Sequence, residues 1–466
     1  MRFVIFGLGR EGKSSYHFLR QIFNNVEIVL TDDQPLGKLS GDWKSILTHD
    51  DHSSFATTSN LPQSALTESI MVLSPGISPN HKLLKQASAS TPITTNTQLF
   101  LETVLPGRAK NSLIKAHLPK LTKQPLVIGV TGTKGKSTTA HAIHYLLDNS
   151  GVPCLLGGNI GQPPLELIEP VQELLSQEPE KQTVVVLELS SHQLSRVNIS
   201  PQIAVVQAIT PEHLDYYSDF DSYKAAKSQI TAFGQPEDTV IYNQDNLEAR
   251  QVAANSPGEK LAFGLETKGD HQPSLDMNKL QLKGGHNYLN LIPAVIIGKK
   301  LHLPQAQIEA VLATLSPLPH RLEPVATIEG VTYINDSLST TPEATIAALG
   351  SFPGQPIILI AGGFDRGLNF TQLAQAIKQS LVKTVILLPE TGQKIKTALA
   401  STQDRISRSS PPPQVILVKN LKTAISTAKQ LATSGDVVLL SPAAASFNQF
   451  KDYAERGEEF KELVKE

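Results

Sequence analysis

Short apolar runs alternate with longer segments of helical periodicity along most of this chain. The run PLVIGV at 125–130 is apolar and β-branched, as expected of a strand that is buried in a parallel sheet. Shortly after it, Ala140, Ile143 and Leu147 share one helical stripe, and the periodic segment ends at Gly151. Because strands that alternate with helices form parallel sheets, the pattern predicts an α/β fold.

The alternation is interrupted twice, and the interruptions divide the 466 residues into three parts. Residues 1–100 alternate strands and helices, whereas 101–124 contains prolines, basic residues and little periodicity, which is typical of a connector. Alternation resumes over 125–317 and again over 318–466, after the proline-rich SPLPHR. Each long part can bury a core of its own. We expect Rossmann-like domains at both ends and a central parallel-sheet domain of the P-loop ATPase type.

Composition narrows the class of protein. A formal net charge of −2 without a basic block argues against a general nucleic-acid-binding protein. The single cysteine, Cys154, excludes an internal disulfide framework and fits a reducing compartment. The apolar run FVIF is too short for a signal peptide, and no stretch approaches the length of a membrane span. We therefore expect a cytoplasmic protein that contacts neither nucleic acid nor membrane.

The stretch GVTGTKGKST at 129–138 lies between the strand and the helix described above. In such a turn the backbone N–H groups and the helix dipole favour a phosphate, Lys136 can reach it, and the Ser137 hydroxyl can face Mg²⁺. Val130 stands where G-x-x-x-x-G-K-[ST] has its first glycine, so a glycine-rich surface turn is the alternative interpretation. The pattern predicts an ATP site formed by Gly132, Thr133, Lys134, Gly135, Lys136, Ser137 and Thr138.

A second glycine pattern occupies the first strand–helix turn. Gly7, Gly9 and Gly12 form G-x-G-x-x-G, and Asp32 follows about 20 residues later. This is the fingerprint of dinucleotide-binding domains, so an NAD-dependent oxidoreductase is one hypothesis. The glycines only allow a diphosphate to approach a helix N-terminus, however, and UDP-sugars carry that group too.

Further polar clusters follow the central strands. Glu188 ends the apolar run TVVVLE, a position where a carboxylate can face a ligand or Mg²⁺, although such residues are often solvated. His213 follows another strand within PEHLD, and Lys224 and Lys227 lie on a predicted helix. A lone loop histidine or a helical lysine usually just faces water. Each of these signals is weak by itself.

Taken together, these residues resemble the Mur ligase family, over almost the whole chain from residue 7 to residue 460. Ten landmarks occur in the family's order: SPGI (74–77), TGTKGKST (131–138), GGNIG (157–161), ELSS (188–191), EHLD (212–215), YKAAK (223–227), HNYLN (286–290), HR (320–321), ND (335–336) and SPAAASF (441–447). The SPGI turn and the tail SPAAASFNQF…ERG are most similar to the members that use D-glutamate.

The resemblance implies an ATP-dependent, ADP-forming ligase that joins an acid to an amino acid through an acyl phosphate. Its substrates would be UDP-N-acetylmuramoyl-L-alanine and D-glutamate, in the cytoplasmic synthesis of peptidoglycan precursors on which cell shape and division depend. We expect a monomer. The folate-polyglutamating members share the ATP loop but lack a UDP-binding first domain like residues 1–100.

The same resemblance assigns roles to individual residues. The catalytic positions are Lys136, His213 and Lys227. The Mg²⁺ ligands are Ser137 and Glu188 for one ion, and His213 and carbamylated Lys227 for a second. Further ATP contacts are Asn287, Asn290, Arg321 and Asp336. The UDP-sugar positions are Gly7, Leu8, Gly9, Arg10, Asp32, Ser74, Gly76 and Asn159. The D-glutamate positions are Thr340, Arg366, Ser446, Phe447 and Tyr453.

Carbamylation of Lys227 has a physical requirement that can be checked. The reaction with CO₂ turns a cation into an oxygen ligand, which a hard metal prefers. It needs the neutral amine, so burial must lower the lysine pKa from its usual ~10.4.

Three motifs depart from the family pattern, and the two that change a lysine concern the incoming amino acid. NDSLSTT places Leu338 where the family has lysine, and Arg366 stands where lysine is common. Ala208 and Glu212 replace the usual Asn and Asp of N-x-T-x-D-H. The same chemistry with another acidic amino acid, such as L-glutamate, is therefore an alternative. A non-catalytic nucleotide-binding protein is another, although Lys136 and Lys227 are retained.

Overall fold

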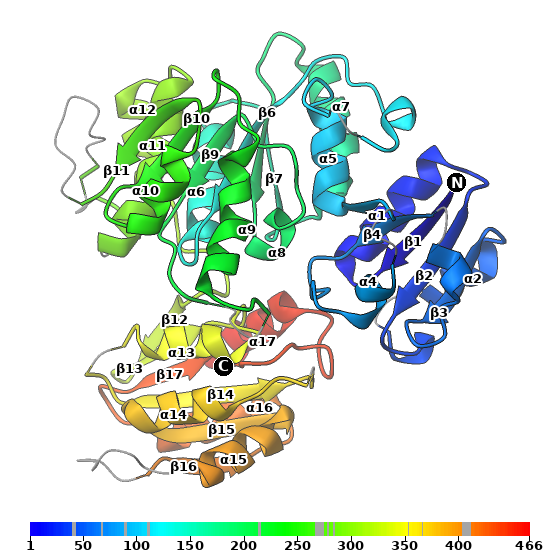
Figure 1. Ribbon diagram of the computed structural model, residues 1–466. Helices are drawn as coiled ribbons and strands as arrows, with labels where there is room; N and C mark the ends of the chain where they lie inside the picture. The colour runs from blue at the N-terminus through cyan, green and yellow to red at the C-terminus, as the bar shows by residue number, and fades with distance from the viewer. Residues whose placement is uncertain are drawn as a thin grey trace. The chain divides into compact units, whose positions relative to one another are not determined.

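The computed structural model describes residues 1–39, 43–66, 69–87, 91–109, 112–212, 216–265, 275–276, 279–282, 285–352, 354–365, 367–402 and 412–466. The chain forms two compact units, Met1–Leu315 and Ser316–Glu466 (Figure 1). Three sheets occur in the described part, two in the first unit and one in the second. None of the helices in these ranges combines the length and apolar character that a membrane span requires.

The first sheet is parallel and has the strand order β3-β2-β1-β4-β5. Its strands are β1 (Arg2–Phe6), β2 (Glu27–Asp32), β3 (Ser53–Thr57), β4 (Ser69–Leu73) and β5 (Ile93–Thr95). Its helices are α1 (Arg10–Ile22), α2 (Trp43–His49), α3 (Gln63–Leu66), α4 (Lys82–Gln86) and α5 (Asn96–Val104). The order reverses between β1 and β4, so the loops that follow these two strands lie side by side, where ligands bind in open α/β sheets.

The second sheet is also parallel, with the order β11-β10-β9-β6-β8-β7. Its strands are β6 (Leu126–Thr131), β7 (Cys154–Gly158), β8 (Val184–Glu188), β9 (Ile203–Val206), β10 (Thr239–Asn243) and β11 (Glu259–Phe263). The helices are α6 (Lys136–Asp148), α7 (Ile168–Gln177), α8 (Ser191–Leu194), α9 (Phe220–Ala232), α10 (Leu247–Ala254), α11 (Gly285–Lys300) and α12 (Gln305–Ala313). The ends of β6 and β8 therefore lie next to each other.

The second unit contains the third sheet, with the order β12-β13-β17-β14-β15-β16. Its strands are β12 (Glu323–Ile328), β13 (Val331–Asn335), β14 (Ile357–Gly363), β15 (Val382–Glu390), β16 (Gln414–Leu417) and β17 (Val437–Leu440). Its helices are α13 (Pro342–Leu349), α14 (Thr371–Gln379), α15 (Thr391–Ser401), α16 (Leu421–Leu431) and α17 (Tyr453–Lys465). Only β12 runs antiparallel to its neighbour β13; the other pairs in this sheet are parallel.

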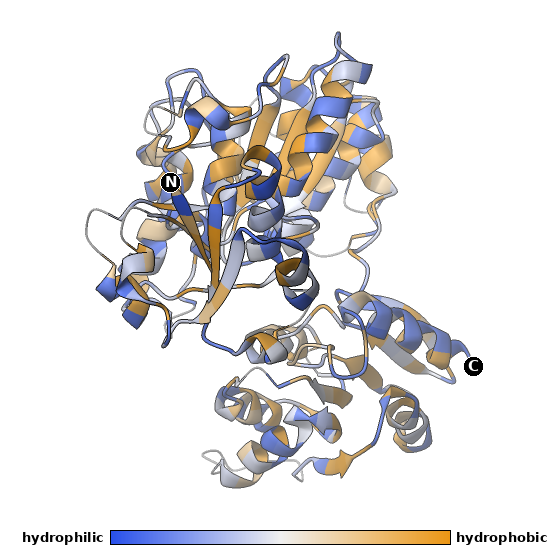
Figure 2. Cartoon of the chain, turned by 90° about the vertical axis from the view of Figure 1, so that its right-hand side faces the viewer, coloured by the Kyte–Doolittle hydropathy of each residue, from blue (hydrophilic) through white to orange (hydrophobic). Residues whose placement is uncertain are grey.

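Apolar residues concentrate along the strands, and polar residues colour the outer faces of the helices (Figure 2). On α6, Ala140, Ile143 and Leu147 are fully buried, which confirms the predicted helical stripe. The α/β class with parallel sheets is likewise confirmed. The antiparallel strand β12 is a departure from the predicted alternation, because a tight turn at Glu329 and Gly330 folds it back onto β13.

Candidate active site

The turn between β6 and α6 depends on two glycines with positive φ. Gly132 has φ +148° and Gly135 has φ +85°, conformations that a side chain would strain. A Cβ on Gly135 would lie 2.2 Å from Oδ1 of Asn290, and one on Gly132 would lie 2.6 Å from Cβ of Gln207. The loop therefore has the compact shape and the helix N-terminus that a phosphate site requires.

Polar side chains from α6 and α11 meet at this loop. Lys136 donates from Nζ to the Thr133 carbonyl at 2.8 Å, so the lysine lies over the turn. Asn290, on α11, packs against Gly135, and its Nδ2 contacts Oδ1 of Asn287 at 3.4 Å. The structure thus brings the predicted ATP residues of α11 to the predicted phosphate loop. Lys134, Ser137 and Thr138 occupy the same turn and helix start.

Glu188 is a buried carboxylate at the end of β8, the strand that pairs with β6. Its side chain is 1% exposed, and Oε1 accepts a hydrogen bond from Nδ2 of Asn159 at 2.8 Å. Oε2 is buried without a hydrogen-bond partner among the described residues. An orphaned buried carboxylate oxygen is costly unless something positive or hydrogen-bonding faces it. The Glu188 side chain therefore fits a cation ligand.

Lys227 is the second unusual group, because the helix α9 turns it inward. Its side chain is 1% exposed, Nζ donates to the Gly132 carbonyl at 2.7 Å, and Nζ lies 4.8 Å from the centre of the Tyr223 ring. Burial holds the Lys227 pKa well below its usual value, and the Lys136 cation lowers it further. Glu212 and Glu188 act in the opposite direction without cancelling this effect. The lowered pKa favours the neutral amine, which carbamylation requires.

These donors are compatible with a hard metal ion. Glu188 offers a buried oxygen, Ser137 lies at the start of α6, and Lys227 would supply oxygens only after carbamylation. His213, the remaining predicted ligand, lies outside the described residues. Across the described ranges, no three His, Cys, Asp or Glu side chains form a ready-made metal cluster.

Apart from Asn159, which follows β7, the predicted UDP-sugar residues lie at the ends of β1, β2 and β4. The backbone N–H of Leu8 donates to Oδ2 of Asp32 at 2.9 Å, and Oγ of Ser74 donates to the Gly7 carbonyl at 2.5 Å. Gly9 caps α1 at its N-terminus, and Gly76 lies in the turn after Ser74. The structure places these residues together at one edge of the first sheet.

Three contacts that the sequence patterns did not reveal link this edge to the loops around Glu188. Arg10 donates to the carbonyl of Gly161, in the turn that carries Asn159. Gln193, in the capping box of α8, donates from Nε2 to Oε1 of Glu11 at 2.8 Å. The hydroxyl of Tyr216 donates to the Ile77 carbonyl at 2.8 Å. The predicted diphosphate site and the predicted metal site are therefore neighbours within the first unit.

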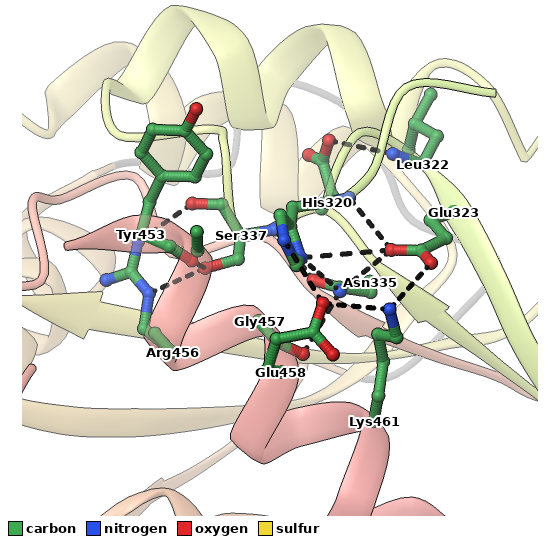
Figure 3. Close-up of polar contacts among 12 residues, drawn as sticks. His320, Leu322, Glu323, Asn335, Ser337, Tyr453, Arg456, Gly457, Glu458 and Lys461 are labelled. Atoms are coloured by element: carbon green, nitrogen blue, oxygen red, sulfur yellow. Dashed lines mark hydrogen bonds and ion pairs between the residues drawn. The ribbon is translucent and has the colours of Figure 1, made fainter.

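In the second unit the predicted residues surround the end of β13. Asp336 is 1% exposed and accepts hydrogen bonds from the Leu322 N–H at 3.1 Å and from Oγ of Ser441 at 2.7 Å. Burial raises the pKa of Asp336 to about 6, although these hydrogen bonds and nearby Arg321 oppose the shift. Tyr453 packs edge-on against His320 (Figure 3).

The residues predicted to bind D-glutamate differ from one another in how far they are buried. Ser446 is buried, whereas Phe447 is 47% exposed with its ring 6.1 Å from that of Phe364. Thr340 is half-buried, two residues after Leu338. Arg366 lies outside the described residues.

Arg456 is a buried cation that the sequence reasoning missed, although it belongs to the quoted ERG motif. Its guanidinium donates to Oγ and the carbonyl of Ser337 and to the Ala444 carbonyl, all neutral groups (Figure 3). Burial lowers its pKa to about 9. It joins the segment after β13 to the one after β17.

Comparison with known proteins agrees with this arrangement. The family model "Mur ligase middle domain" matches residues 130–298, and "Mur ligase, glutamate ligase domain" matches 320–444. The UDP-N-acetylmuramoylalanine--D-glutamate ligase of Desulfitobacterium hafniense (strain Y51) is 32% identical, over 99% of this chain and 97% of the relative. The chain belongs to the Mur ligase family. This Mur ligase is therefore an enzyme that forms an amide bond with ATP, and the family does not favour the oxidoreductase hypothesis.

A second relative and two solved structures are also similar to this chain. The enzyme of the same name from Symbiobacterium thermophilum is 36% identical to this Mur ligase, over 72% of this chain and 75% of the relative. Among solved structures, a UDP-N-acetylmuramate-alanine ligase from Thermotoga maritima has a TM-score of 0.54 at 16% identity, covering 100% of this chain and 99% of that one. The folylpolyglutamate synthase of Mycobacterium tuberculosis has a TM-score of 0.53 at 14% identity, over 78% of this chain and 94% of that one. At such identities these two structures support the fold alone.

Proposed function

We propose that this Mur ligase adds D-glutamate to UDP-N-acetylmuramoyl-L-alanine through an acyl-phosphate intermediate, in the synthesis of peptidoglycan precursors. The observation that carries the substrate assignment is the match, in identity as well as in length, to relatives named for this activity. Relatives named for this activity align with 99% of the chain, including residues 1–100.

The reaction requires two anions to meet. A carboxylate oxygen of the UDP-substrate attacks the γ-phosphorus of ATP, the bond from that phosphorus to the bridging oxygen breaks, and ADP leaves. The amine of D-glutamate then attacks the acyl carbon and loses a proton, and phosphate leaves with one of the original carboxylate oxygens. Positive charge between the anions is therefore the main catalytic need.

The first unit has residues suited to that need. Lys136 would neutralise the phosphates of ATP on the 132–138 loop, with Asn287 and Asn290 holding the nucleotide on the side of α11. Two Mg²⁺ ions, one held by Ser137 and Glu188 and the other by His213 and carbamylated Lys227, would supply further positive charge. The buried amine of Lys227 and the orphaned oxygen of Glu188 support this assignment. Arg321 and Asp336 are proposed as further contacts of the nucleotide.

The three parts of the chain divide the substrates between them in this proposal. Residues 1–100 bind the UDP-substrate, 125–317 bind ATP, and 318–466 bind the amino acid, with 101–124 as connector. Glutamate would contact Thr340, Arg366, Ser446, Phe447 and Tyr453. The enzyme acts in the cytoplasm as a monomer, apart from membranes and nucleic acid.

Phosphate release with UDP-N-acetylmuramoyl-L-alanine, ATP and a panel of D- and L-amino acids tests the proposal. We expect release with D-glutamate to exceed that with every other amino acid. Equal or faster release with L-glutamate would transfer the assignment to another acidic amino acid, which Leu338 makes a real alternative. No release with any amino acid would contradict the proposed reaction.

A further inference from the structure

The backbone on both sides of Arg321 is left-handed without a glycine. His320 has φ +62° and Leu322 has φ +46°. Histidine enters this region more readily than most residues, but a bulky side chain such as leucine seldom does. Strained backbone persists only where the surrounding structure fixes it, and such residues cluster at functional sites. The contacts that fix the backbone of 320–322 are therefore expected to serve the function of Arg321.

Side chains from the sheet fix the backbone of this segment. The His320 N–H donates to Oε2 of Glu323 at 2.8 Å, and the Leu322 N–H donates to Oδ1 of Asp336 at 3.1 Å. The His320 carbonyl accepts from the Leu338 N–H at 2.9 Å. The backbone groups on either side of Arg321 are thus tied to β12, to the end of β13 and to the residues after it.

The His320 ring, 5% exposed, is fixed by Asn335. Asn335 accepts from the Ser337 N–H through Oδ1, so its Nδ2 is the atom that faces Nδ1 of His320, at 2.9 Å, and the Gly457 carbonyl, at 3.2 Å. Nδ1 must therefore accept, which assigns the ring proton to Nε2. Nε2 lies 3.5 Å from Oε1 of Glu458.

Helix α17 closes the far side of the ring (Figure 3). Lys461 contacts Glu458 at 3.0 Å and Glu323 at 3.2 Å, so it joins the helix to the start of β12. A Cβ on Gly457 would lie 2.2 Å from Nδ1 of His320. The helix approaches so closely that only glycine fits there, although glycine is a poor helix former.

We propose that His320 is a positioning residue for Arg321. Helix α17, through Gly457 and Glu458, fixes the His320 ring, and the fixed ring holds the backbone of Arg321 in the conformation that binds the nucleotide. The inference rests on the proposed contact of Arg321 with ATP. His320 itself touches no substrate in this account. If the ring only filled the core, its loss would lower stability without a specific effect on ATP.

Gly457→Ala is the most selective test, because it displaces the ring without removing a charge or a hydrogen-bonding side chain. Alanine also favours the helix more than glycine does. Glu462→Ala, on an exposed position of the same helix, is the matched control. We expect Gly457→Ala to raise KM for ATP about tenfold or more and to leave KM for the UDP-substrate unchanged. In the control variant Glu462→Ala, both KM values should stay as in the parent enzyme.

A second pair of variants applies if Gly457→Ala perturbs the helix as a whole. Asparagine at 320 tolerates the left-handed backbone and can present a side-chain oxygen to Asn335. Alanine adopts the left-handed backbone poorly and has no side-chain acceptor for Asn335. We expect His320→Asn to keep KM for ATP well below that of His320→Ala, which should approach that of Arg321→Ala.

The outcomes separate this inference from the proposed function. If Arg321→Ala raises KM for ATP while Gly457→Ala and His320→Ala leave it unchanged, the positioning role is overturned and the ATP assignment stands. If Arg321→Ala itself leaves KM for ATP unchanged, the assignment of Arg321 to the nucleotide fails, and the positioning role fails with it.

Discussion

Asn159 donates a hydrogen bond to one oxygen of Glu188 at 2.8 Å, and the other oxygen of Glu188 has no partner among the described residues. One oxygen is therefore fixed by the turn after β7, and the second is left for a ligand. A carboxylate that served only the fold would be satisfied on both sides.

Glu188→Gln should consequently reduce the rate by 100-fold or more and weaken the dependence on Mg²⁺. The neutral amide keeps the shape of the side chain and its contact with Asn159, but it is a poor ligand for a hard cation. Titration of the rate with Mg²⁺ measures the effect, and the exposed Glu166→Gln is the control. A Glu188→Gln enzyme with an unchanged Mg²⁺ titration would remove this residue from the metal site.

Lys227 gives a second prediction, because a solvated helical lysine and a carbamate ligand behave differently. Activity should collapse in Lys227→Ala and also in Lys227→Arg, since arginine cannot form the carbamate oxygen. Acetate should restore part of the rate in the alanine variant by replacing that oxygen. The control is Lys224→Ala, one turn earlier, where the lysine is more exposed and pairs with Asp221 at 3.0 Å. Normal turnover in Lys227→Arg would contradict the carbamate role.

Lys136→Ala should abolish ATP turnover and leave the fold intact. Its amine donates to the Thr133 carbonyl of the phosphate loop at 2.8 Å and the side chain is only half-buried, so little packing is lost. Charge-assisted hydrogen bonds contribute roughly 1.5–3 kcal/mol each, and this one should matter more in the transition state than in the ground state. Phosphate release and thermal unfolding are the two measurements. Near-normal release would exclude the loop as the ATP site.

Asp336 gives a prediction about stability and pH. Its pKa is about 6 in the fold and 3.8 ordinarily, so the unfolded chain ionises first as pH rises from about 4 to about 6, and the fold loses stability over that window. Asp336→Asn lacks this penalty. The variant should be more stable than the parent at pH 8, by on the order of 1–3 kcal/mol, and the difference should shrink at pH 4, while activity falls. Denaturant unfolding of variant and parent at both pH values measures the difference in their free energies of unfolding. A stabilisation of the variant that is smaller at pH 8 than at pH 4 would contradict the prediction.

The sequence predicted most strands because their apolar, β-branched runs are unmistakable, as in β6 and β8. It did not predict β7, whose residues include Gly157 and Gly158. Glycine is unfavourable in a strand by local preference, but here a Cβ on Gly158 would lie 2.2 Å from the Glu188 carbonyl, so the close approach of β8 requires it. The strand is specified by a long-range contact that no local pattern contains.

The same limit applies to the site. Residue types at strand and helix ends indicated Lys136 and Glu188, because they suit phosphate and metal chemistry, whereas Lys227 was assigned only through the resemblance to the Mur ligases. The helical pattern by itself did not indicate that Lys227 faces inward, since Lys224 on the same helix is similar in sequence and not in burial. The left-handed backbone at His320 was also beyond reach, because it depends on the fit of Gly457 in a helix more than 100 residues later.

Oxygen-18 transfer tests the central claim most directly. UDP-N-acetylmuramoyl-L-alanine labelled in both carboxylate oxygens is incubated with ATP and D-glutamate, and phosphate and product are weighed by mass spectrometry. An acyl-phosphate route places one labelled oxygen in each phosphate and leaves one in the new amide. Phosphate without label, or a product that retains both labelled oxygens, would contradict the account.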